Sequence, residues 1–361
     1  MADIGTLIQN IERDGTVRTI MRNPRAQFGT AARPLLGATL LPEVEVPENA
    51  YREEAIRLRT IIANAGTRYG PAQKKGGDLV ASFLVELSHS DIARELTSRD
   101  FDALRRLVGA SDVEAMARLI DFMDRVNLGL VELNEVMRWQ AIVSAAVTLT
   151  GDNGYSETVS YANPSGHRAN AAGTWSSDAY DPFDGDIFPR MDLLASKGYQ
   201  VNRIISSRNV VSILGGNDKV KARTGVATIN ASGQITSVAG RASLTAINDA
   251  LQRDGLPPIE MYDLLYRNQT GTARFLASNV FVMVATTGQD ATVDQGDSQR
   301  ILNDTLGYMA IGTPAGQDTP GRAMYMQAFR NKPPRVEAEA WQASLPVVTE
   351  PEAIAVIAAI A

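Results

Sequence analysis

A long run of apolar residues at helical spacing, over residues 111–148, most constrains what this chain can fold into. Ser111 and Glu114 have the spacing of a capping box, which satisfies free amides at the start of a helix. The apolar residues are Val113, Met116, Ile120, Met123, Val126, Leu130, Leu133, Met137 and Ala141. We expect a helix about 55 Å long, ended by Gly151, with Met137 and Trp139 in the core. Such a rod is longer than an ordinary helix and predicts a structural spine.

The composition fits a globular protein and excludes several classes. The chain has 361 residues, 44% hydrophobic and 21% charged, enough for two or three packed units. We find no apolar run of membrane-spanning length and no signal-peptide pattern after Met1, so we expect no membrane partner. The absence of cysteine excludes disulfides and thiol chemistry and fits a cytosolic product.

The first 98 residues predict an irregular segment followed by a long hairpin. A short helix is expected over 4–13, and prolines at 24, 34, 42 and 47 then favour an extended course. Residues 54–63 and 78–89 have strand patterns and are joined by the glycine-rich segment 66–77. Because an isolated hairpin is marginally stable in water, we expect it to lie on another protein surface.

The second half predicts a compact mixed unit, since strands and helices alternate there before a series of late strands. The expected helices are 187–197, capped by Asp184 to Asp186 and ended by Gly198, and also 207–214 and 244–253. The expected strands are 199–206, 259–266, further strands within 273–285, then 308–311, 323–329 and 336–345. A short hairpin is expected within 155–175, and a polar loop over 288–304.

Two segments, together with this order of elements, make the sequence resemble a known protein family. One holds Trp175, Asp181, Pro182 and Asp186; in the other, a strand meets Pro346, turns near Pro351 and ends in a second apolar strand. With the arm, the hairpin and the spine helix before them, they make the sequence resemble the Hong Kong 97-like capsid fold. Within that fold it is similar to the lambda-like coat proteins of tailed phages, the major capsid protein E family. The resemblance covers residues 99–361 by order of elements and residues 1–98 more loosely.

The resemblance implies an α+β fold with an N-terminal arm, an extended β-hairpin loop, a peripheral domain with the long spine helix, and an axial domain. The implied divisions are an arm (1–47), an extended loop (48–98), a peripheral domain (99–183), an axial domain (184–270), a return through the peripheral sheet (271–345) and a final axial strand (346–361). It implies a non-enzymatic virion protein, without cofactors. Hexamers and pentamers would assemble in the host cytoplasm into an icosahedral head that encloses double-stranded DNA. Scaffolding would come from a separate protein; a portal is also implied, and a decoration protein stays open.

Two basic segments are the candidate contact sites. Between Gly15 and Pro42 there are four arginines and no acid: Arg18, Arg22, Arg25 and Arg33. A solvated arm is the simpler interpretation; an arm on a neighbouring subunit, or one facing packaged DNA without sequence preference, is the other. At the hairpin tip, Arg68, Lys74 and Lys75 are candidates for inter-subunit contact. Some members of this fold cross-link such a lysine to a neighbour, but the polar, glycine-rich tip lacks the desolvated pocket this needs. We therefore expect no cross-link.

The spine carries acids at 114, 121, 124, 132 and 135 among Arg118, Arg125 and Arg138. This pattern fits either a solvated face with helical ion pairs or contact with a neighbouring spine.

We find no pattern of catalytic or metal-binding residues. His89 and His167 are far apart in sequence and lack neighbouring ligands. Asp181, Asp184 and Asp186 fit a turn and helix cap better than a calcium loop. Three alternatives to a phage capsid protein stay open: an encapsulin-type compartment shell, a phage tail or head-completion protein, and, least favoured, an α/β hydrolase with its site within 184–266.

Overall fold

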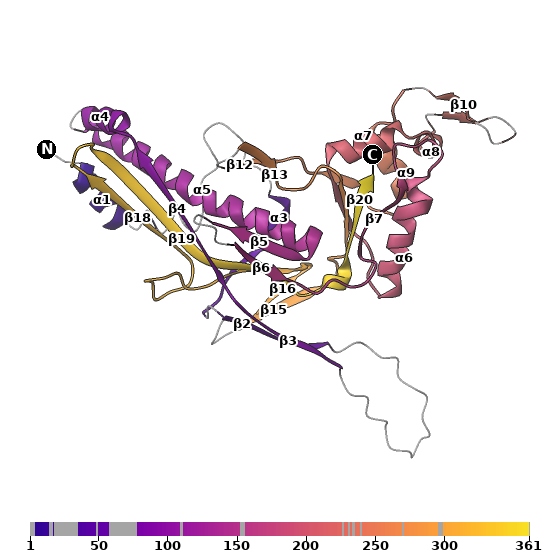
Figure 1. The fold of residues 1–361 in the computed structure, drawn as a ribbon, viewed down its shortest axis with the longest axis horizontal. Coiled ribbons are helices and arrows are strands. Elements are labelled where there is room, and N and C mark those ends of the chain that lie inside the picture. Colours follow the sequence, from indigo (N-terminus) through magenta and orange to yellow (C-terminus); the bar gives the residue numbers. More distant parts are fainter. Residues whose placement is uncertain are drawn as a thin grey trace, which may run out of the picture.

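The computed structural model describes residues 4–13, 17, 35–47, 50–57, 78–108, 111–151, 156–225, 227–229, 232, 235–238, 240–268, 271–294 and 299–360. Two five-stranded sheets organise these residues, one toward each end of the molecule (Figure 1). The first sheet has the order β1 (Glu43–Glu45), β17 (Gly307–Ile311), β19 (Arg335–Val348) and β18 (Arg322–Phe329), and β4 (Ser88–Leu96) also pairs with β19. The second sheet has the order β11 (Ile259–Met261), β8 (Arg203–Ser206), β14 (Val280–Val284), β20 (Ile354–Ile360) and β7 (Arg168–Thr174).

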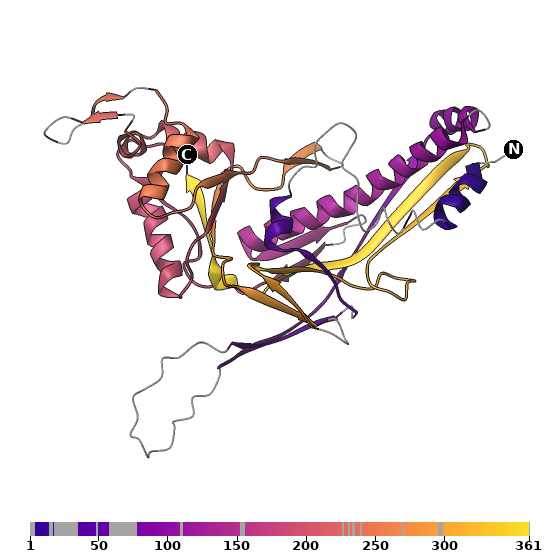
Figure 2. The same ribbon diagram turned by 180° about the vertical axis from the view of Figure 1, so that it is seen from behind.

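The long helix α5 (Asp112–Ser144) lies along the first sheet, as both ribbon views show (Figure 2). Ser111 accepts a hydrogen bond from the amide of Glu114, so the predicted N-cap is confirmed. The helix ends earlier than predicted, at Ala145 in the left-handed conformation, rather than near Gly151. The next residues, Ala-Val-Thr-Leu-Thr, favour a strand and form β5 (Ala146–Thr150), which pairs with β6 (Ser156–Ser160).

The core between α5 and the first sheet also receives two other helices. Ile4, Leu7, Ile8 and Ile11 form the buried face of α1 (Ile4–Arg13), whose predicted bounds are confirmed. Phe101 and Leu104 of α4 (Ser98–Leu107) join the same core. The helix α3 (Leu36–Leu40) lies farther along α5, between the two sheets.

The second sheet is surrounded by helices. All five residues of β14 are buried, as expected of a strand covered on both faces. The helices at this end are α6 (Phe188–Ser196), α7 (Arg208–Gly216), α8 (Asp218–Arg223) and α9 (Leu244–Arg253). The bounds of α9 were predicted correctly, and its N-cap Ser243 accepts a hydrogen bond from the amide of Ala246.

Several hairpins leave this body. The longest pairs β2 (Ala50–Arg57) with β3 (Asp78–Glu86) and points away from both sheets (Figures 1 and 2), so the predicted long hairpin is confirmed in its described part. The shorter pairs are β9 (Ala227–Ile229) with β10 (Ile235–Val238), β12 (Leu265–Asn268) with β13 (Gly271–Arg274), and β15 (Asp290–Asp294) with β16 (Gln299–Asn303).

Besides the end of α5, four local predictions were wrong in whole or in part. Residues 155–175 do not form a hairpin: β6 pairs with β5, and β7 runs parallel to β20. The expected polar loop at 288–304 holds β15 and β16. Pro346 lies inside β19, opposite Met309, rather than in the terminal turn, whereas the expected turn near Pro351 is present as the 3₁₀ turn Pro351–Ala353. Asp184 and Asp186 belong to a π-helical turn, Phe183–Ile187, rather than to an N-cap.

Candidate functional site

The contact residues predicted from the sequence lie outside the described residues. This holds for Arg18, Arg22, Arg25 and Arg33 of the arm and for Arg68, Lys74 and Lys75 of the hairpin tip. The described residues instead provide two buried polar clusters and one exposed acidic face of the first sheet.

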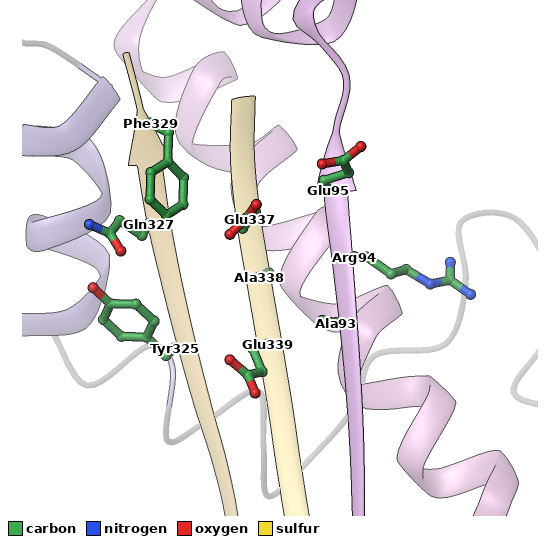
Figure 3. Close-up of a pocket in the computed structure, with 9 residues that line it drawn as sticks. All are labelled: Ala93, Arg94, Glu95, Tyr325, Gln327, Phe329, Glu337, Ala338 and Glu339. Carbon is green, nitrogen blue, oxygen red and sulfur yellow. The ribbon is translucent and has the colours of Figure 1, made fainter. Parts of the chain in front are cut away.

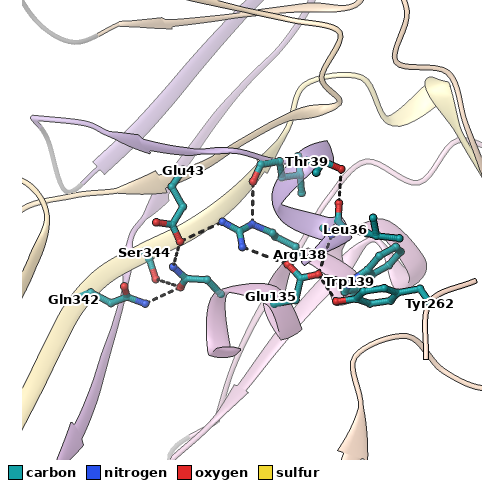
Figure 4. Close-up of polar contacts among 12 residues, drawn as sticks. Leu36, Thr39, Glu43, Glu135, Arg138, Trp139, Tyr262, Gln342 and Ser344 are labelled. Carbon is teal, nitrogen blue, oxygen red and sulfur yellow. Dashed lines mark hydrogen bonds and ion pairs between the residues drawn. The ribbon is translucent and has the colours of Figure 1, made fainter. Parts of the chain in front are cut away.

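The first cluster surrounds the buried carboxylate of Glu135 on α5 (Figure 4). Its Oε1 accepts hydrogen bonds from the Gly37 amide at 2.8 Å, the Trp139 indole at 2.8 Å and the Tyr262 hydroxyl at 2.7 Å. Its Oε2 accepts from Arg138 at 3.4 Å. Burial and the Glu135 carboxylate raise the pKa of the Tyr262 hydroxyl, which keeps it a donor. One carboxylate therefore joins α3, the spine helix and the end of β11.

The same cluster continues to Glu43 on β1. Glu43 Oε1 accepts from Asn134 at 2.9 Å, from Arg138 at 3.2 Å and from Arg322 at 2.6 Å. Burial alone would raise the pKa of Glu43, but the guanidinium groups of Arg322 and Arg138 outweigh it and hold the pKa below its ordinary value. Asn134 in turn accepts from Gln342 at 2.6 Å and from Ser344 at 3.2 Å, both on β19.

The sequence interpretation of the spine charges was half right. Glu114 with Arg118 and Asp121 with Arg125 form exposed ion pairs one turn apart. Glu135 and Arg138, in contrast, are buried. The sequence contained a sign that this part of the helix is buried. Asn134 and Arg138 fall on the apolar helix face that Leu130, Met137 and Ala141 define.

The second cluster is built on the Trp-to-Asp-Pro segment. The buried carboxylate of Asp186 accepts from the Ala172 amide at 2.8 Å, the Trp175 indole at 2.7 Å and the Tyr180 hydroxyl at 2.7 Å. Burial and the hydrogen bond to Asp186 raise the pKa of Tyr180 to about 12. Asn217, the N-cap of α8, holds the segment from the other side, because its amide donates to the carbonyls of Trp175 and Tyr180.

The carboxylates of Asp181 and Asp184 form ion pairs with an arginine of the same chain. Arg223 on α8 pairs with both carboxylates and lies over the rings of Phe183 and Phe188. Among the described residues no group of three or more His, Cys, Asp or Glu could hold a metal ion. His89 is an exposed residue of β4, and His167 is buried with its Nδ1 2.9 Å from the carbonyl of Ile354. In the part of the chain described, no helix is both long and apolar enough to cross a membrane.

The exposed acidic face belongs to β4, β19 and β18 on the side of the first sheet that faces away from α5. Val336, Ala338 and Ala340 of β19 are buried against α5, so Glu337 and Glu339 point to the opposite side. A shallow hollow forms there, lined in part by Tyr325 and Gln327 of β18, as Figure 3 shows. Glu95 of β4 lies across from Glu337, and Arg335 pairs with both acids at the end of the face.

This arrangement of sheets, spine helix and hairpin is similar to solved structures, whereas two comparisons of the sequence found no match. No protein-family model matches the chain, and no curated protein does. A protein assigned as a prophage capsid protein from E.coli CFT073 superposes with a TM-score of 0.59 at 14% identity, covering 97% of this chain and 98% of that chain. A phage-related protein from Bordetella bronchiseptica RB50 superposes with a TM-score of 0.52 at 13% identity, covering 95% and 96%.

The chain has the Hong Kong 97-like capsid fold. The predicted α+β class and this fold are therefore confirmed. Both similarities extend over nearly the full length of each chain. At this level of identity the similarity concerns the fold, so the function has to be argued from the surfaces of the Hong Kong 97-like subunit.

Proposed function

We propose that this chain is the major capsid protein of a tailed phage, of the lambda-like type, and builds an icosahedral head around double-stranded DNA. The main support is the Hong Kong 97-like fold, shared over nearly the whole chain with a protein assigned as a prophage capsid protein. The role is structural rather than enzymatic. The two buried clusters fit this role, because their carboxylates bond to protein donors inside the core.

Subunit contacts would use the long hairpin. Its two strands, β2 and β3, lead away from the body, and we propose that residues 58–77, which connect them in the chain, contact a neighbouring subunit. That segment contains four cations and no acid: Arg59, Arg68, Lys74 and Lys75. On a neighbouring copy, the acidic face at Glu95, Glu337 and Glu339 would offer this segment a surface of opposite charge. Repeated around a ring, such contacts would join subunits into hexamers and pentamers.

The arm would supply the contact with DNA. The net charge of the chain is −6, which argues against a dedicated nucleic-acid binder. Four arginines without an acid between Gly15 and Pro42 suffice for weak phosphate attraction without sequence preference. In this proposal the protein assembles in the host cytoplasm with a separate scaffolding protein and a portal, and ends in the virion; a decoration protein stays open.

Electron microscopy of the purified protein, with an assay of nuclease-protected nucleic acid, tests this proposal. Closed shells from preparations made with the phage packaging proteins, holding protected double-stranded DNA, are the expected result. Closed shells that enclose a protein cargo would favour the encapsulin alternative, and tubes would favour a tail protein. Soluble monomers under all assembly conditions would contradict the proposal.

A further inference from the structure

Residues 36–46, here named the strap, cross from one sheet to the other. Leu40 and Leu41 are buried in the core of the second sheet, together with Trp139. Val44 and Val46 are buried in the core of the first sheet. The candidate arm precedes the strap in the chain, and the projecting hairpin begins at Ala50. The strap therefore connects the two segments proposed to contact neighbouring subunits.

Backbone and side-chain contacts hold the strap along its length. The amides of Leu306 and Met309 donate to the carbonyls of Leu40 and Pro42, at 3.1 and 2.8 Å. Arg138 of the spine donates to the carbonyl of Leu41 at 2.9 Å. Pairing of β1 with β17 fixes the end of the strap in the first sheet.

Glu135 is the point at which the strap, the spine and the second sheet meet. It accepts from Gly37 on the strap side and from Tyr262 on the second-sheet side. The approach is close, since a Cβ on Gly37 would lie 2.8 Å from the Glu135 carboxylate oxygens. The Tyr262 ring also lies against Trp139, with ring centroids 5.2 Å apart. The Gly37 amide and the Tyr262 hydroxyl donate to the same oxygen, Oε1, so both contacts depend on the position of one carboxylate.

We infer that Glu135 is a positioning residue that couples the strap to the orientation of the second sheet relative to the spine. A pull on the hairpin would act through the strap on this carboxylate and change the angle between the two sheets. The coupling to neighbouring subunits rests on the proposed shell function, whereas the joint itself is a property of the single subunit.

Hydrogen exchange of the free subunit, read by mass spectrometry, tests the joint without assembly. Tyr262→Phe removes one donor to Glu135 and keeps the ring. We expect exchange in residues 36–46 to become roughly tenfold faster, because a hydrogen bond to a buried carboxylate is lost. Gly37→Ala, which perturbs the same carboxylate from the strap side, should speed exchange at 259–262. The matched control is Tyr266→Phe, on the neighbouring strand β12, which should change neither segment.

Two results would overturn the inference. In the free subunit, a Tyr262→Phe effect confined to residues near 262, with the strap unchanged, would show that the two sides are independent. In assembled particles, Tyr262→Phe should broaden the distribution of shell diameters relative to Tyr266→Phe. Equal distributions would overturn the coupling to assembly. Failure of every variant and of the unmodified chain to assemble would contradict the proposed function and leave the exchange result as the test of the joint.

Discussion

Asp186 shows how one side chain can fix a segment that has little regular structure. Its carboxylate accepts from an amide, an indole and a phenol, and it is buried. Asp186→Asn keeps the size but places an amide donor against these donors. We expect it to lower the free energy of unfolding by about 1–3 kcal/mol, measured by denaturant titration. Asp192→Asn, at an exposed position of α6, is the control and should stay within about 0.5 kcal/mol. An equal effect of the two substitutions would contradict this role.

Glu43 predicts a pH dependence of stability. Its pKa in the folded state lies below the ordinary value of 4.5, so the folded state favours the ionised form. The stabilisation is therefore complete above about pH 4.5 and is lost as the pH falls through the lower folded pKa. Glu43→Gln should be less stable than the unmodified protein at pH 7, and the difference should shrink toward pH 3. Thermal unfolding midpoints across this range provide the measurement, and a constant difference would refute the assignment.

At the scale of elements, α1 is expected to depend on its docked face. Ile11 of α1 is fully buried against α5 and the first sheet. Ile11→Ala should cost about 2–5 kcal/mol for the loss of a buried aliphatic side chain. Limited proteolysis should then cut near residues 4–13 faster than in the unmodified chain. Gln9→Ala, on the exposed face of the same helix, should not change the rate, and equal cleavage of both variants would mean that the helix is not docked.

Elements with a strong local pattern were predictable, and pairings between distant strands were not. The bounds of the helices α1 and α9 and the strand β18 were predicted from the residues of each segment alone. The strand β4 was missed, because its burial pattern is irregular and its pairing with β19 depends on residues far away in the chain. The same reason explains β7, whose partner β20 is the last strand. From the sequence, Glu135 was assigned to the charged stripe of the spine helix. Its burial was not predictable, because it depends on contacts with the strap and with Tyr262, which are distant in the chain.

At the scale of the whole molecule, the assembled shell should be held by non-covalent contacts. Lys74 and Lys75 are the candidate donors for a cross-link, and they lie in a glycine-rich polar segment. Boiling assembled particles in detergent should give a single band at 38.9 kDa on an electrophoresis gel. A ladder of covalent oligomers would contradict this expectation.

Reversal of charge on the acidic face should weaken assembly without unfolding the subunit. Glu337 and Glu339 lie on the side of β19 that faces away from α5, so Glu337→Lys with Glu339→Lys should preserve the fold and repel the cationic hairpin tip. Light scattering should show a lower yield of particles, and circular dichroism an unchanged subunit. Glu114→Lys, on the exposed start of the spine, serves as the single-charge control. Normal particle yield from the double variant would exclude this face as the docking surface.

A cryo-electron microscopy reconstruction of the assembled particle would show directly whether the subunits build a closed shell through these surfaces. We expect a closed icosahedral shell of pentamers and hexamers, with the β2–β3 hairpin of each subunit lying on the β4–β19–β18 face of its neighbour. A tube, an open ring without closure, or a shell whose hairpins make no contact with neighbouring subunits would contradict it.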